Sequence, residues 1–145
     1  MFTSGKVPAL IITTTAGAKR LREQSGSASV DIRAIRGSAT AIPASAILAE
    51  VIRARPCKRV LVEGGPRLLG DFYAEQLVDE QFLTLAPQIA GRDAGDRRLS
   101  LVMGKVFAPG DPLWGTMIDA RRGSSHLFLR YSFPESRPGP RTGRI

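Results

Sequence analysis

The sequence predicts an α/β domain with a mixed sheet that ends in an antiparallel hairpin. Short apolar runs rich in β-branched residues alternate with stretches of helical periodicity in the first part of the chain. Near the C-terminus, two alternating segments flank a short turn, which is typical of a hairpin. A chain of 145 residues, 43% of them hydrophobic, can bury one core, so we expect one domain.

The first part of the chain contains two predicted strands and two predicted helices. Residues 9–14 (ALIITT) are predicted to form a buried strand, and residues 30–35 alternate apolar and polar side chains, which predicts a strand with one wetter face. A helix is predicted at 16–24. A second is predicted at 43–55, where Pro43 suits the first turn and apolar residues fall on one helical face.

The second part follows the order strand, turn, helix, strand and hairpin. A short apolar strand is predicted at 59–62, a helix at 67–76 and an alternating strand at 80–86. The last strands are predicted at 116–121 and 126–133, joined by a turn over Arg122, Gly123 and Ser124. We therefore expect one domain over residues 1–133, followed by a disordered tail at 134–145 that is too rich in Pro, Gly and Arg to bury a core.

Composition argues against several classes of function. The formal charge of +8 would suit an anionic partner, but the basic residues are scattered and four arginines lie in the last sixteen positions, so we expect no nucleic-acid partner. No apolar run is long enough to span a membrane, so we expect no membrane partner. One Cys and one His cannot form a disulfide or a tetrahedral zinc site, which favours a cytoplasmic protein without a metal.

A glycine turn at residues 63–71 (EGGPRLLGD) is the strongest candidate site. Gly64 and Gly65 carry no side chains where a strand turns into a helix, and Pro66 stands where a helix can spare an N–H group. Free amides of the first turn and the helix dipole favour an anion there. The spacing fits neither the dinucleotide fingerprint nor the P-loop. From these residues alone, a purely structural turn remains the alternative.

The region around this turn resembles a known enzyme family. Residues 60–91 (VLVEGGPRLLGDFYAEQLVDEQFLTLAPQIAG) are similar to the C-terminal reductase domain of the riboflavin-biosynthesis deaminase/reductase family. That family shows an apolar strand, Glu-Gly-Gly-Pro, a helix with Leu and Gly, Leu-Val-Asp-Glu, and a strand ending in Ala-Pro, in this order. The runs LIITTT (10–15) and LFLRY (127–131) add to the resemblance, which covers most of residues 7–133.

The resemblance implies a three-layer fold like that of dihydrofolate reductase, with a mainly parallel sheet. It implies hydride transfer from NADPH to a phosphorylated ribosylamino-pyrimidine, and a homodimer. Glu63 would face the substrate, and Thr13 or Thr14 would contact the adenosine side of NADPH. The cofactor phosphate would be held by Gly64, Gly65, Pro66, Arg67, Leu68, Leu69, Gly70 and Asp71.

Other interpretations of these residues stay open. Glu63 could instead cap the helix that follows, and Arg67 could be an ordinary exposed residue of a first helical turn rather than a ligand of the extra phosphate of NADPH. Asp79 and Glu80 could mimic a catalytic pair, but a turn and a solvated strand start explain them better. The catalytic residues are not predicted.

The chain also departs from the family pattern. Nothing in it matches the upstream strand with the Ser-Leu-Asp-Gly motif, which in the family supplies most substrate contacts and the nicotinamide side of the cleft. We therefore expect the N-terminal strands of the fold to be missing and the isolated chain to be inactive. A non-catalytic nucleotide-binding or dimerisation remnant, a related reductase acting on a pterin-like substrate, and a basic nucleic-acid-binding module are the alternatives.

Overall fold

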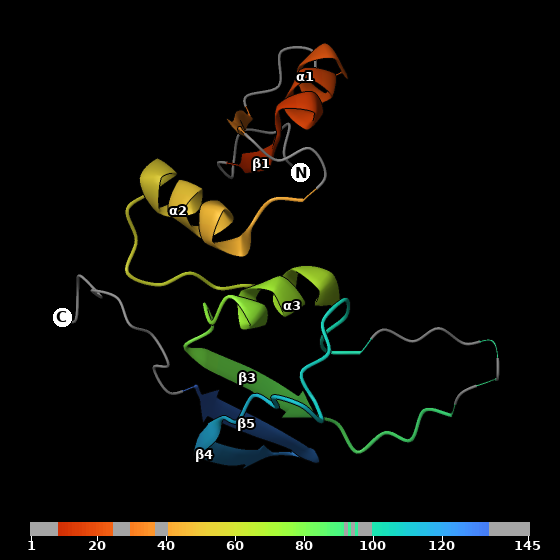
Figure 1. Cartoon of the computed structure of the whole chain (residues 1–145). Coiled ribbons are helices and arrows are strands. Elements are labelled where there is room, and N and C mark those ends of the chain that lie inside the picture. The colour runs from red at the N-terminus through yellow and green to blue at the C-terminus, as the bar shows by residue number, and fades with distance from the viewer. Residues whose placement is uncertain are drawn as a thin grey trace. The chain divides into compact units, whose positions relative to one another are not determined.

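A computed structural model describes residues 9–24, 30–36, 41–91, 93, 95 and 100–133 (Figure 1). The chain divides into two compact units, Met1–Leu61 and Val62–Ile145, which are described separately below. The tail predicted to be disordered, residues 134–145, lies outside the described residues.

The first unit contains a parallel strand pair with its connecting helix, followed by a second helix. Strand β1 (Leu10–Thr14) leads into helix α1 (Thr15–Gln24), and strand β2 (Asp31–Ile35) pairs with β1 in parallel from Leu10↔Asp31 to Thr14↔Ile35. Helix α2 (Ala44–Ala54) follows Pro43, as predicted. The β-branched run at the start of the chain forms the strand, and the helical periodicity forms both helices.

The turn from β1 into α1 depends on close packing. The Gly17 N–H donates to Thr14 Oγ1 over 3.1 Å, so Thr14 caps the helix with its hydroxyl. Gly17 and Ala18 are buried on α1. A Cβ at residue 17 would lie 2.2 Å from Thr13 Oγ1, so only glycine allows the helix to approach the strand this closely.

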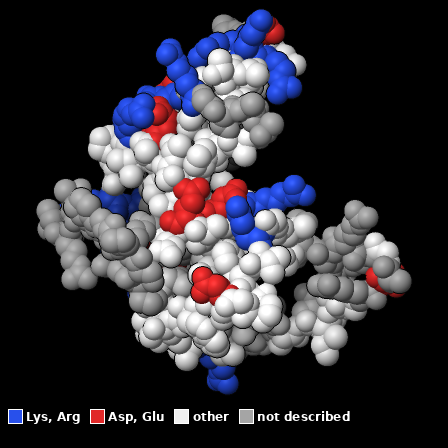
Figure 2. Space-filling model, in the orientation of Figure 1, with Lys and Arg blue, Asp and Glu red and all other residues white. Residues whose placement is uncertain are grey.

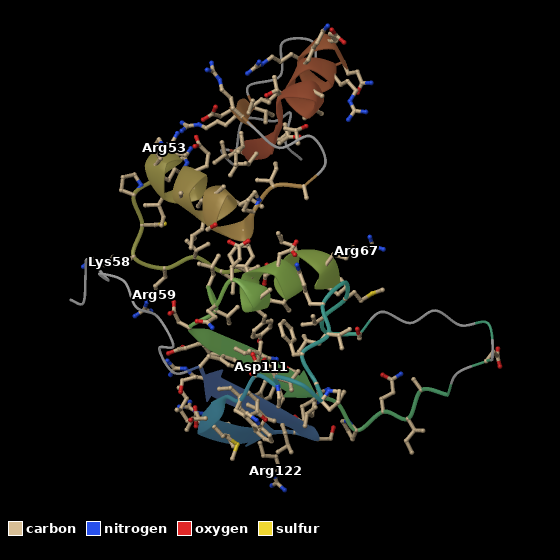
Figure 3. All side chains as sticks on the ribbon, in the orientation of Figure 1. Arg53, Lys58, Arg59, Arg67, Asp111 and Arg122 are labelled. Carbon is tan, nitrogen blue, oxygen red and sulfur yellow. The ribbon has the colours of Figure 1, made fainter. Side chains whose placement is uncertain are left out.

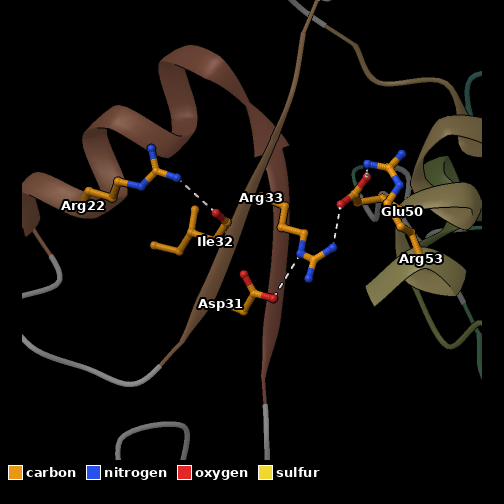
Figure 4. A network of polar contacts seen from close by, with 6 residues as sticks. All are labelled: Arg22, Asp31, Ile32, Arg33, Glu50 and Arg53. Carbon is orange, nitrogen blue, oxygen red and sulfur yellow. Dashed lines mark hydrogen bonds and ion pairs between the residues drawn. The ribbon is translucent and has the colours of Figure 1, made fainter. Parts of the chain in front are cut away.

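A buried carboxylate connects β2 with α2 (Figure 4). Glu50 is 7% exposed. Its Oε1 accepts a hydrogen bond from Arg33 Nη1 at 3.0 Å and its Oε2 lies 2.7 Å from Arg53 Nη1. Arg33 also binds Asp31 at 3.0 Å, and these two carboxylates raise the pKa of Arg33, with Glu50 as the larger cause. Two guanidinium partners offset the cost of burying this carboxylate.

The described residues of the second unit form one helix and a three-stranded antiparallel sheet. Helix α3 (Pro66–Ala74) precedes strand β3 (Glu80–Leu85), and strands β4 (Thr116–Gly123) and β5 (His126–Ser132) form the C-terminal hairpin. The strand order is β3-β5-β4, with β5 in the middle (Figure 1). A bidentate ion pair also joins β3 and β5, in which Arg130 Nε and Nη2 donate to the two carboxylate oxygens of Glu80 at 2.9 and 2.6 Å.

Aromatic residues attach α3 to this sheet. Phe72 and Tyr73 are 4% and 6% exposed. The Tyr73 hydroxyl donates to Gln81 Oε1 over 2.7 Å, and its ring meets Phe133 edge-on with centroids 5.3 Å apart. Burial raises the pKa of Tyr73 above its usual range. One face of the sheet is therefore covered by α3.

The structure confirms the α/β class, with a parallel pair and a C-terminal antiparallel hairpin. The parallel and antiparallel strands lie in two separate sheets within the described part of the chain. The predicted strand at 59–62 is wrong there, because this segment pairs with no described strand and leaves Val60 39% and Leu61 75% exposed. An apolar run can specify an extended backbone, but a strand also requires a neighbour for its N–H and C=O groups.

The hairpin turn also lies later than predicted. Arg122 and Gly123 belong to β4, and the turn is formed by Ser124 and Ser125, with Ser124 at a φ of 53°. The turn is displaced because Gly123 pairs directly with His126, so only two residues remain for the loop. Ser124, the first residue of this loop, adopts the positive φ that two-residue hairpin loops require at that position.

Candidate functional site

The predicted glycine turn leads directly into α3. Gly65 is the N-cap, with φ −66° and ψ 167°, and Pro66 opens the helix. The first helical hydrogen bond runs from Leu69 N to Gly65 O at 3.1 Å, so the amides of Arg67 and Leu68 precede it. No side chain caps this end of the helix. An uncapped helix N-terminus presents free N–H groups and the positive end of the helix dipole to an anion.

The two glycines of the turn have different surroundings. A Cβ on Gly65 would meet no atom within 4 Å, so the backbone there is open to a ligand. A Cβ on Gly64 would lie 2.5 Å from Leu68 Cδ2, so packing against the first turn of α3 already favours a glycine at that position. Gly65 is therefore the position where a missing side chain serves access rather than packing.

Three of the predicted phosphate ligands lie within the helix. Leu69 donates the first helical hydrogen bond, and Gly70 and Asp71 follow it, where backbone amides bond within the helix. Gly70 is buried, and a Cβ there would lie 2.9 Å from the carbonyl oxygen of Met103. Asp71 Oδ1 lies 3.2 Å from Lys105 Nζ. The open part of the turn is thus confined to its start.

Glu63 and Arg67 are exposed on either side of the turn. The N-cap position of α3 is Gly65, two residues after Glu63. Arg67 extends from α3 into open space (Figure 3). On the face drawn in Figure 2, Lys and Arg gather mainly around α1, where Lys19, Arg20 and Arg22 are exposed, and mix with acidic residues elsewhere.

The structure groups Glu63 and the residues up to Asp71 in one turn and helix, whereas Thr13 and Thr14 belong to the other unit, at the end of β1. The hydroxyl of Thr14 is used to cap α1. Met103 and Lys105 contact α3 from a segment of irregular structure, and no pattern in the sequence marks them.

Within the described ranges, no cluster of His, Cys, Asp and Glu could hold a metal ion. In the same part of the chain, no helix is both long and apolar enough to cross a membrane.

Comparison with known families identifies the fold to which this turn belongs. Residues 1–103 match the model of the RibD C-terminal domain. The chain belongs to the RibD C-terminal domain family. This confirms the family resemblance carried by the Glu-Gly-Gly-Pro turn and the segments around it.

Solved structures with similar folds include a pyrimidine reductase-like protein and RibD. A pyrimidine reductase-like protein from Corynebacterium diphtheriae superimposes with a TM-score of 0.63 at 20% identity, over 88% of this chain and 50% of that one. RibD from Acinetobacter baumannii, in its form 2, gives a TM-score of 0.62 at 17% identity, over 90% of this chain and 35% of that one. These matches show the fold. No curated protein matches the chain.

The chain therefore spans 50% of the length of the Corynebacterium protein and 35% of the length of the Acinetobacter protein.

Proposed function

We propose that this chain provides the cofactor-phosphate part of an NADPH-dependent reductase of riboflavin-biosynthesis type. The reaction is 5-amino-6-(5-phosphoribosylamino)uracil reductase activity, a hydride transfer from NADPH to a phosphoribosylamino-pyrimidine. The observation that carries the proposal is the open, uncapped Gly65 turn at the start of α3, in a chain of the RibD C-terminal domain family.

The residues of the turn fit the phosphates of NADPH. The missing side chain of Gly65 lets a phosphate approach the backbone, where the amides of Arg67 and Leu68 can donate to its oxygens. The exposed guanidinium of Arg67 can pair with a further phosphate in a bidentate way. The Glu63 carboxylate, just before the turn, can accept hydrogen bonds from ring or ribose groups of the substrate.

Binding and turnover are separate expectations. When bound, NADPH supplies the hydride. Transfer requires cofactor and substrate in near-attack geometry, which the phosphate turn alone does not provide. We therefore propose NADPH binding for this chain, and turnover only where the nicotinamide and substrate sides of the cleft are also provided.

The test compares two substitutions at Gly65 that have the same shape and differ in charge. Gly65→Asp places a carboxylate against the phosphate, and we expect it to weaken NADPH binding by about tenfold, equivalent to about 1.4 kcal/mol. Gly65→Asn keeps the shape without the charge and should retain most of the affinity. Both variants have open space for the side chain, so folding should be preserved. NADPH fluorescence titration measures the dissociation constants; two folded variants that both bind NADPH as tightly as the wild type would remove this turn from the site.

A non-catalytic nucleotide-binding protein is the second candidate. The observation that favours it is that the open, uncapped Gly65 turn accounts for phosphate binding by itself. The two candidates differ in one measurement. Oxidation of NADPH by the purified chain in the presence of a phosphoribosylamino-pyrimidine supports the reductase, and NADPH binding without oxidation supports the second candidate.

We also propose that the chain is a cytoplasmic homodimer. The support for a partner is the face of the antiparallel sheet that α3 does not cover. Phe82 and Phe128 share this face, because Phe82 pairs with Arg130 and Phe128 lies two residues before Arg130 on β5. They are 69% and 48% exposed. Neighbouring exposed aromatic side chains of this kind are typical of association surfaces.

A further inference from the structure

An irregular segment of the second unit, residues 100–105, lies against α3, and we call it the α3 strap. The Met103 N–H donates to the carbonyl oxygen of Pro66 over 3.0 Å. Further along the helix, Lys105 Nζ lies 3.2 Å from Asp71 Oδ1. The strap is therefore attached to α3 at its first residue and again more than one helical turn later.

The strap approaches α3 so closely because residue 70 is a glycine. A Cβ on Gly70 would lie 2.9 Å from Met103 O and 3.1 Å from Val102 Cγ1. The nearer of these is a backbone atom, which cannot rotate out of the way as a side chain could. The strap itself turns at Gly104, whose φ of 79° is in the left-handed region that favours glycine. Two glycines, one in the helix and one in the strap, thus allow this contact.

We propose that the α3 strap positions the first turn of α3 and thereby sets how tightly the Gly65 turn binds a phosphate. The hydrogen bond from Met103 reaches Pro66, the residue directly after Gly65. The bond ends on a carbonyl oxygen, so it restrains the first turn and leaves the N–H groups of Arg67 and Leu68 available to a phosphate. Met103 and Lys105 act through α3 as positioning residues. The inference rests on the proposed function, because the phosphate is that of NADPH.

The main test is Gly70→Ala, with Gly91→Ala as its matched control. The added Cβ at residue 70 forces Met103 O away, whereas a Cβ at residue 91 meets no atom within 4 Å. In Gly70→Ala we expect the NADPH dissociation constant to rise about tenfold, as loss of one well-oriented charge-assisted hydrogen bond would cause. We also expect faster hydrogen exchange at the Leu69 amide, the first bonded amide of α3. Gly91→Ala should change neither quantity.

A second pair of variants loosens the strap without adding bulk. Lys105→Met removes the ion pair with Asp71, which is half-exposed, and we expect NADPH binding to weaken by about two- to fivefold. Lys105→Arg keeps the charge and should restore the affinity. This pair also serves if Gly70→Ala does not fold.

The outcomes separate the strap from the cofactor site. If the wild type binds NADPH and both Gly70→Ala and Lys105→Met bind it more weakly, the cofactor site and the role of the strap are both supported. If folded Gly70→Ala and Lys105→Met bind NADPH as tightly as the wild type does, the proposed role of the strap is overturned and the cofactor site still stands. A wild-type chain that does not bind NADPH overturns the proposed function and the strap's role in it. Faster Leu69 exchange in Gly70→Ala would then show only that the strap orders the helix.

Discussion

The amide of Met103 donates a hydrogen bond to the carbonyl oxygen of Pro66, and this 3.0 Å contact ties an irregular segment to the first residue of α3. It connects the most recognisable motif of the chain, the Glu-Gly-Gly-Pro turn, with a segment that has no recognisable pattern. Several consequences of such contacts can be measured.

Gly65→Asp should stabilise the chain while it weakens NADPH binding. Asp is a better N-cap than Gly, and Gly65 already has the extended backbone that an N-cap needs. We expect a gain of a few tenths of a kcal/mol in the free energy of unfolding of the second unit. Hydrogen exchange of the amides of α3 measures the gain. Faster exchange would show that residue 65 is not a true N-cap, and Gly65→Asn is the uncharged control.

Glu50→Ala should destabilise the first unit. The substitution leaves Arg33 and Arg53 without their shared carboxylate at a site that is 7% exposed, and we expect a loss of about 1 to 3 kcal/mol. Hydrogen exchange of the β2 amides measures this unit separately from the other. Arg53→Ala is the control, because its side chain is 70% exposed and its loss should cost no more than about 1 kcal/mol. Equal effects of the two substitutions would contradict a central role for Glu50.

Gly17→Ala should also destabilise the first unit, although alanine favours helices. The new Cβ would lie 2.2 Å from Thr13 Oγ1, and overpacking of this kind costs about 1 to 3 kcal/mol against a gain in helix propensity of about 1 kcal/mol. Adding Thr13→Ala removes the clashing hydroxyl and should restore the stability. Thermal unfolding followed by circular dichroism compares the single and double variants. A double variant no more stable than Gly17→Ala would place the strain elsewhere.

Tyr73 should make the second unit less stable at alkaline pH. Burial raises its pKa in the folded state, so the folded chain keeps the phenol proton after the unfolded chain has lost it. This contribution is complete below the ordinary tyrosine pKa of about 10 and is lost as the pH rises through the folded-state value. At neutral pH, Tyr73→Phe should lower the free energy of unfolding by about 1 kcal/mol, because the hydrogen bond to Gln81 is lost. At high pH the wild type also loses stability, so the difference between variant and wild type should become smaller. Urea unfolding at several pH values tests this; a constant deficit would be inconsistent with it.

Phe82→Ser should convert the proposed homodimer into a monomer. The side chain is 69% exposed on the uncovered face of the sheet, so its removal costs little folding stability in the monomer. Ile89→Ser is the matched control, because Ile89 is fully exposed outside the sheet and should leave the dimer intact. Light scattering coupled to gel filtration gives the masses. A wild-type monomer would refute the homodimer, and a dimer unaffected by Phe82→Ser would place its interface elsewhere.

The local elements were predictable because their causes are local. Periodicity of apolar residues gave the strands and helices to within a few residues, as at β1 and α2, and Pro66 after two glycines marked the start of α3. The same turn and its flanking segments predicted the family. The predicted strand at 59–62 shows where this approach ends, since an apolar run does not say whether a neighbouring strand is present.

The sequence by itself determined the α/β class, the glycine turn at Gly64 and Gly65, and the RibD family. Only the tertiary structure showed that Gly70 serves packing against Met103, while the side chain missing at Gly65 leaves the backbone open. Both glycines look alike in a motif. Their roles differ because Gly70 faces the backbone carbonyl of Met103, which belongs to a segment distant in the sequence. Every residue has such a carbonyl, so this contact leaves no pattern in the sequence.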